Sequence, residues 1–143
     1  MRLLRAKALA MTKTNNGDLQ DLTPQQEHHK KMTKLIYYTN ASQDNPFDKF
    51  LDSLTEVQQR KILRILANIQ NYGLTNAIPH IKKLTNTPLW EIRILGQDNI
   101  RVFYATLLEN SILILHGFSK KTQKTPPREI ETALNRLKDW LDS

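Results

Sequence analysis

Residues 89–118 decide the fold, and they read LWEIRILGQDNIRVFYATLLENSILILHGF. Within this stretch, three runs are rich in β-branched and aromatic residues, which is typical of strands, and they lie at 89–95, 100–108 and 111–118. The connections between them are short enough to form hairpin turns. We therefore predict three antiparallel strands that neighbour one another in one sheet. Apolar residues occupy both sets of alternating positions, so helices should cover one face and part of the other.

Helical patterns flank this stretch on both sides. Upstream, Asn45 and Pro46 fit an N-cap followed by proline at the first helical position, and the TEVQ sequence at 55–58 fits a capping box. Gly73 ends this pattern, so residues 45–72 are predicted to form a helical hairpin or one bent helix. Downstream, apolar residues at helical spacing predict a last helix from about Pro127 to Leu141.

The remaining segments complete the order of elements. The run KLIYYT at 34–39 favours a further strand, whereas Pro79 and Pro88 bracket a predicted loop that contains Lys82 and Lys83. The order is then strand, two helices, three strands, helix. It indicates an α+β fold in which a small, mostly antiparallel sheet packs against helices.

The first 31 residues differ from the rest, because no apolar period holds across them for long. We divide the chain into an N-terminal extension, 1–31, and one domain, 32–143. The extension is expected to be mobile, or to result from a start codon placed too far upstream, with Met32 as the true start.

Composition narrows the class of function. The net charge of +7 and the isoelectric point of about 9.7 favour nucleic acid as a partner, with a membrane surface or an acidic protein as competitors. The chain has no cysteine, and its histidines lack metal-ligand spacing, so we expect neither metal nor cofactor. No apolar run is long enough to span a membrane, and no secretory signal is evident. We therefore expect a cytoplasmic protein.

Positive charge gathers in one part of the domain. Eight of its 15 lysines and arginines lie within 82–128, where only three acidic residues oppose them. This concentration favours a phosphate-binding surface, although loop lysines are often only solvated.

Arg93 and Arg101 differ from the loop lysines, because each interrupts an apolar strand where an unpartnered cation is costly. Two uses are open. One is an internal ion pair with Glu91 or Glu109, and the other is a site where an anionic ligand meets both guanidinium groups. Their place on adjacent strands favours the second use.

Several blocks of the chain form a family pattern: LWEIR at 89–93, RVFY at 101–104, LHGFSKKTQKTP at 115–126, the helical Pro46-Phe47, Phe50-Leu51 and Leu54, and the loop with Pro79 and Lys82-Lys83-Leu84. Together, and in this order, they resemble the RelE/ParE toxin superfamily, most closely its HigB-like branch, also called phage Gp49-like. The similarity covers about residues 34–140.

The resemblance implies the RelE-like toxin fold and membership of a type II toxin–antitoxin system. It implies a metal-independent endoribonuclease that cleaves mRNA, usually on the ribosome, and thereby arrests translation. It also implies a cognate antitoxin, commonly a helix-turn-helix protein of the HigA kind.

RNA cleavage without metal requires cations around the attacked phosphate, together with groups that remove and supply protons. Arg101 matches the strand arginine that contacts the scissile phosphate in related toxins, and Arg93 would assist it. Lys121 lies on the loop where the family places further cations. The residues expected to bind the RNA backbone are Lys82, Lys83, Lys120 and Lys124.

The candidates for proton transfer are His116, Tyr104 and His80, with a lysine of lowered pKa as a fourth. His116 shares its strand parity with three apolar residues, Ile112, Ile114 and Phe118. A core role is therefore the alternative for His116, as it is for Tyr104. The helix-entry tyrosine of well-known members has no counterpart, because Pro126-Pro127 occupies its place. The chemistry is therefore expected to depend on lysines and on groups from the ribosome.

Three other functions stay open at this point. A ParE-like toxin would inhibit DNA gyrase and have no nuclease activity. A non-catalytic phage protein would bind nucleic acid with steep salt dependence and would not arrest growth. An inert relic would do neither.

Overall fold

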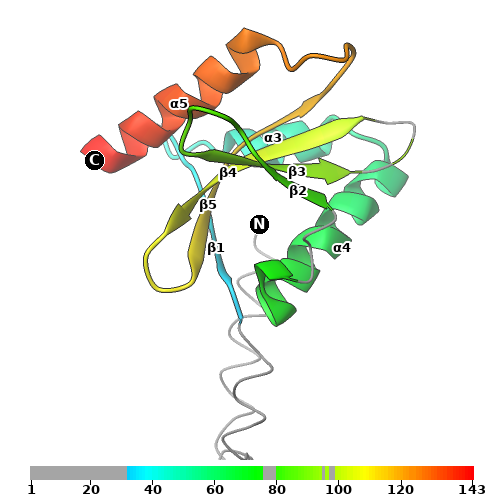
Figure 1. Cartoon of the computed structure of the whole chain (residues 1–143), viewed down its shortest axis with the longest axis horizontal. Coiled ribbons are helices and arrows are strands. Elements are labelled where there is room, and N and C mark those ends of the chain that lie inside the picture. The colour runs from blue at the N-terminus through cyan, green and yellow to red at the C-terminus, as the bar shows by residue number, and fades with distance from the viewer. Residues whose placement is uncertain (1–31, 76–79, 95, 97–98) are drawn as a thin grey trace, which may run out of the picture. The chain divides into compact units, whose positions relative to one another are not determined.

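The fold is built on a five-stranded sheet, seen in a computed structural model that describes residues 32–75, 80–94, 96 and 99–143 (Figure 1). Its strands are β1 (Lys34–Tyr37), β2 (Ile81–Lys83), β3 (Leu89–Ile94), β4 (Ile100–Leu107) and β5 (Ser111–Ser119). The helices are α3 (Pro46–Asp52), α4 (Glu56–Tyr72) and α5 (Pro127–Asp142). The predicted extension, 1–31, and Pro79 lie outside the described residues. The mixed α+β class is confirmed.

The strands lie side by side in the order β1-β5-β4-β3-β2. The predicted antiparallel neighbours β3, β4 and β5 are confirmed, and β1 runs parallel to β5 at one edge. Glu109 and Asn110 connect β4 to β5 with φ angles of 61° and 58°, which is typical of a tight hairpin turn.

The loop predicted between Pro79 and Pro88 is wrong in part, because β2 forms there as the other edge strand. It pairs antiparallel with β3, so that Lys82 lies opposite Glu91 and Lys83 lies opposite Trp90. Successive side chains of a strand point to opposite faces of the sheet. The two adjacent lysines therefore point to different faces.

Of the two predictions for 45–72, a helical hairpin or one bent helix, the structure shows two separate helices, α3 and α4. The Asn45 side chain accepts hydrogen bonds from the backbone N–H groups of Phe47 and Asp48 and so caps α3. Thr55 opens α4 with a complete capping box, and Gly73 ends it with a φ angle of 86°. Glycine adopts this left-handed conformation without the steric cost that a side chain would add.

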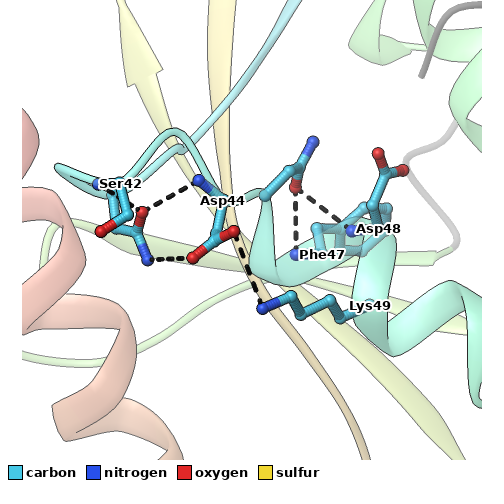
Figure 2. Close-up of polar contacts among 7 residues, drawn as sticks. Ser42, Asp44, Phe47, Asp48 and Lys49 are labelled. Atoms are coloured by element: carbon cyan, nitrogen blue, oxygen red, sulfur yellow. Dashed lines mark hydrogen bonds and ion pairs between the residues drawn. The ribbon is translucent and has the colours of Figure 1, made fainter.

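Polar contacts also fix the connection that leads from β1 into α3 (Figure 2). The Asn40 side chain accepts hydrogen bonds from the backbone N–H groups of Ser42 and Asp44, both at 2.9 Å. Lys49 Nζ lies 3.9 Å from Asp44 Oδ1 and thus links the connection to the helix. These contacts hold the start of α3 in a defined position over the sheet.

The helix α5 covers one face of the sheet, which we call the α5 face. The buried cluster beneath it combines residues of β3, β4, β5 and α5 with Tyr38, which follows β1; its members are Tyr38, Leu89, Phe103, Ala105, Leu113, Leu115, Phe118, Ala133 and Leu137. Tyr38 also donates a hydrogen bond of 2.6 Å to Asp139, which ties the helix to the end of β1.

The opposite face is also covered, and more fully than predicted. Figure 1 shows α4 on the side of the sheet away from α5. The apolar side of α4 is completely buried, through Ile62, Leu66 and Ile69. Helix α3 approaches β5 so closely that a Cβ atom at Gly117 would lie 2.5 Å from Phe50 Cδ2. Gly117 is therefore the site where α3 can contact the sheet backbone.

A register shift between Phe103 and Tyr104 changes the alternation along β5. Phe103 pairs with His116, but Tyr104 pairs with Ile114, which leaves Leu115 as an extra residue. The predicted shared parity of His116 is therefore correct for Phe118 and wrong for Ile112 and Ile114. His116 faces α5, whereas Ile114 lies on the opposite face with Tyr104.

Candidate nucleic-acid interface

A cationic hollow opens beside the ends of β3, β4 and β5. We call it the arginine hollow; it has a volume of about 440 Å³ and is lined by Arg93, Asn99, Arg101, Lys120, Lys121, Thr122 and Gln123. The strands supply the arginines, and the loop after β5 supplies the lysines. The backbone N–H of Lys120 donates to the Asn99 carbonyl at 2.7 Å, which holds this loop against the start of β4.

A second hollow adjoins the first and extends to the edge strand β2. We call it the edge hollow; it has a volume of about 280 Å³ and is lined by Lys82, Leu84, Glu91, Arg93, Lys120, Gln123, Lys124 and Thr125. Arg93, Lys120 and Gln123 line both hollows. The two hollows together bring six cations and one carboxylate to the same part of the α5 face. Such a surface attracts polyanions.

The single carboxylate, Glu91, forms a buried ion pair with Arg101. Arg101 Nε lies 2.7 Å from Glu91 Oε1, and the two side chains are only 9% and 5% exposed. The Nε–H bond is not aligned for a good hydrogen bond, so the contact is mainly electrostatic. Arg101 Nη1 donates to the Ile100 carbonyl at 3.1 Å. For Arg101 the structure thus shows the use that the sequence did not favour, an internal ion pair with Glu91, although the Arg101 side chain also lines the arginine hollow.

Arg93 is exposed and does not belong to this ion pair. It lies directly opposite Arg101 in the β3–β4 register. Like charges in this position repel each other across an antiparallel pair. Among the described residues, no carboxylate forms an ion pair with Arg93. An anion bound between the two arginines would relieve this repulsion.

Lys83 and Tyr104 are not brought to the hollows, because both lie on the opposite face of the sheet. Lys83 Nζ lies 5.3 Å from the centre of the Trp90 ring and donates to the Thr87 carbonyl. Tyr104 is buried and stacks on Trp90, and this burial raises the pKa of its hydroxyl well above the usual value. Neither residue can therefore reach a ligand bound in the hollows of this structure.

His116 lies on the α5 face but outside the lining of both hollows, in a side-chain network with α5. Its Nδ1 is 3.0 Å from Arg136 Nη1, and its Nε2 is 2.9 Å from Glu129 Oε2. A guanidinium can only donate, so Nδ1 must accept and Nε2 must carry the proton. Both ring nitrogens are therefore engaged. Desolvation by burial, with a smaller effect of Arg136, lowers the pKa of His116 despite the opposing effect of Glu129.

This lowered pKa predicts a pH-dependent loss of stability. The unfolded chain takes up a proton near the ordinary histidine value of about 6.5, whereas folded His116 resists protonation to a lower pH. Its contribution to stability is therefore complete above about pH 6.5 and is lost as the pH falls below that value. Thermal unfolding between pH 7.5 and 5 should show a larger decrease in melting temperature for the wild type than for His116→Gln. Parallel pH curves for the two proteins would contradict this assignment.

Sequence reasoning missed three neutral residues that line the arginine hollow, Asn99, Thr122 and Gln123. Thr122 Oγ1 donates to the Lys124 carbonyl at 2.7 Å and so shapes the lysine-rich loop. The only available signal was their position beside the predicted cations. His80, a candidate for proton transfer, is half-buried and lines neither hollow.

The described residues contain no group of three or more histidine, aspartate or glutamate side chains that could hold a metal ion. None of the helices in the described ranges is long and apolar enough to cross a membrane. The fold and the two hollows define a class of protein, a small α+β protein with a cationic site beside the ends of β3, β4 and β5.

Comparison with known families places the chain within this class. Residues 49–138, well over half of the chain, match the model of the phage-derived protein Gp49-like family (DUF891). The chain therefore belongs to this family, a RelE/HigB-like toxin family that is associated with toxin–antitoxin systems and so implies an antitoxin partner. No curated protein matches the sequence.

Proposed function

We propose that this protein is the toxin of a type II toxin–antitoxin system and cleaves mRNA as a metal-independent endoribonuclease in the cytoplasm. The observation that carries this proposal is the convergence of Arg93, Arg101, Lys120 and Lys121 on one hollow. Four cations around one hollow can bind a phosphodiester and stabilise the extra negative charge of a phosphorane.

The reaction would be an internal transesterification. The 2′-oxygen attacks the adjacent phosphorus, the bond from phosphorus to the 5′-oxygen breaks, and the products are a 2′,3′-cyclic phosphate and a free 5′-hydroxyl. The proton of the 2′-hydroxyl must be removed and the 5′-oxygen must be protonated. Since His116 is engaged by Arg136 and Glu129, we propose that loop lysines and groups of the ribosome perform these transfers. The toxin itself would then mainly bind the RNA and stabilise the negative charge of the phosphorane.

The partners follow from the proposal. The ribosome would deliver mRNA in single-stranded form, and a helix-turn-helix antitoxin of the HigA kind would block the toxin. An antitoxin that presents acidic groups would be complementary to the hollows.

The test removes charge where it does not disturb the fold. Arg93 and Lys121 are exposed, so the double variant Arg93→Ala/Lys121→Ala should fold normally. Loss of the Arg93–Arg101 repulsion should leave its free energy of unfolding unchanged or raise it by up to about 1 kcal/mol. After induced expression, mapping of mRNA 5′ ends should show cleavage within translated messages for the wild type and at least a hundredfold fewer cuts for the variant, roughly the effect of losing one strong transition-state contact.

The matched control is Arg64→Ala/Lys138→Ala, which removes the same charge from exposed positions on α4 and α5. It should cleave like the wild type. Growth arrest by Arg93→Ala/Lys121→Ala with signs of DNA damage would support a gyrase-directed toxin instead. Wild-type expression that arrests growth without new mRNA ends would exclude the nuclease.

A further inference from the structure

The edge hollow has cations that a single phosphate bound in the arginine hollow would not contact. Its cations are Lys82, Arg93, Lys120 and Lys124, of which only Arg93 and Lys120 also line the arginine hollow. Each hollow therefore has two cations that it does not share. A single phosphodiester in the arginine hollow would leave Lys82 and Lys124 without a ligand.

Lys82 is held on the correct face by the register of β2. It lies directly opposite Glu91, whose side chain also lines the edge hollow. Glu91 is already paired with Arg101, so it does not neutralise the exposed ammonium of Lys82 fully. Even with this carboxylate counted, the edge hollow retains a clear excess of positive charge, which favours an anionic ligand.

The edge position of β2 leaves a path for an extended ligand. In the order β1-β5-β4-β3-β2 the described residues form no strand beyond β2, so a chain bound in the arginine hollow can continue past Lys82 and leave the sheet. Lysine on an edge strand can alternatively serve to prevent the pairing of sheets between molecules. That role would require no ligand and is distinguishable by experiment.

We propose that the edge hollow is a second phosphate subsite, so that the protein binds two consecutive phosphodiesters of single-stranded RNA, with Lys82 and Lys124 contacting the second. The proposal rests on the proposed function, because it takes RNA as the ligand of the arginine hollow. It adds that affinity depends on the length of the bound strand. Arg93 and Lys120 lie between the two phosphates and contribute to both.

The experiment measures binding without cleavage. The full-length protein is titrated at low salt into single-stranded RNAs of two and four nucleotides, fully 2′-O-methylated and carrying a dye on an uncharged linker. The first RNA has one internal phosphodiester and the second has three. Fluorescence anisotropy gives the dissociation constants, and a salt series gives the number of phosphates neutralised.

The variants Lys82→Ala and Lys83→Ala form a matched pair, because these neighbouring lysines belong to the same strand and point to opposite faces. Lys82→Ala should weaken binding of the four-nucleotide RNA about tenfold and leave the two-nucleotide RNA unchanged, as expected for loss of one charge-assisted contact. It should also reduce the slope of log Kd against log salt by about 0.7. Lys83→Ala should change neither affinity, and Arg93→Ala should weaken both.

Other outcomes separate the two proposals. Equal weakening of both RNAs by Lys82→Ala, or the same effect from Lys83→Ala, would overturn the second subsite and leave a single anion site in place. Unchanged binding by Lys82→Ala together with self-association, measured by sedimentation, would assign Lys82 to protection of the sheet edge. Failure of the wild-type protein to bind either RNA would overturn the RNA site of the proposed function as well.

Discussion

Replacing Arg101 by alanine is expected to lower the free energy of unfolding by about 3–5 kcal/mol and to abolish mRNA cleavage. The reason is the buried pair with Glu91, in which the two side chains are 9% and 5% exposed. Removal of the guanidinium leaves a carboxylate in the protein interior with its nearest counter-charge gone. The free energy of unfolding of a small domain is only about 5–15 kcal/mol, so this variant would lose a large part of its stability. Urea denaturation should show a lower midpoint.

Loss of activity in this variant could reflect unfolding alone, so a second variant is needed. Arg101→Met with Glu91→Leu removes both charges and fills the space with apolar atoms, a change that often preserves or raises stability. We expect this double variant to regain the wild-type midpoint and still fail to cleave mRNA. If it folded and cleaved normally, Arg101 would have only a structural role. A single Arg101→Ala variant as stable as the wild type would disprove the internal pair.

Gly117→Val is expected to lower the free energy of unfolding by about 1–3 kcal/mol or more. A Cβ atom there would lie 2.5 Å and 2.6 Å from two carbons of the Phe50 ring and 3.1 Å from Phe47 Cε1. Such distances are well below van der Waals contact, so α3 must move away from the sheet. The contacts of Asn40, Asn45 and Asp44 that fix the start of α3 oppose this movement.

A double-mutant cycle shows whether the clash is the cause. Phe50→Leu alone should destabilise modestly because it removes apolar contacts. When combined with Gly117→Val, it should recover part of the lost stability, with a coupling energy of about 0.5–3 kcal/mol. Strictly additive effects, measured by urea denaturation, would show that the two residues do not interact.

The sequence predicted most of the sheet because β3, β4 and β5 carry dense runs of β-branched and aromatic residues. It failed at β2, whose sequence is Ile-Lys-Lys. A three-residue strand with two lysines has no apolar alternation, and it forms only because β3 offers an edge to pair with. Local pattern cannot reveal such a strand, since the pairing partner lies elsewhere in the chain.

The candidate site was predictable in its charge and unpredictable in its geometry. Arg93, Arg101 and the lysines near residue 120 stand out by type and position, and the structure brings them together. The neighbours of His116 and the face of the sheet on which Tyr104 lies could not be predicted from the sequence, because one extra residue in β5 changes which side chains share a face. The pairing of Arg101 with Glu91 was one of the alternatives that the sequence offered, but periodicity did not favour it, because the pair is a diagonal contact between strands.

The parallel pairing of β1 with β5 joins two segments of the chain that are synthesised far apart in time. Residues 34–37 are synthesised more than 70 residues before their partners, residues 111–114, and before the loop that lines both hollows. Contacts between such distant segments carry a large loop-closure entropy and form late in folding. A chain whose synthesis stops before β5 and the loop that follows it would therefore lack both the partner of β1 and the assembled cations.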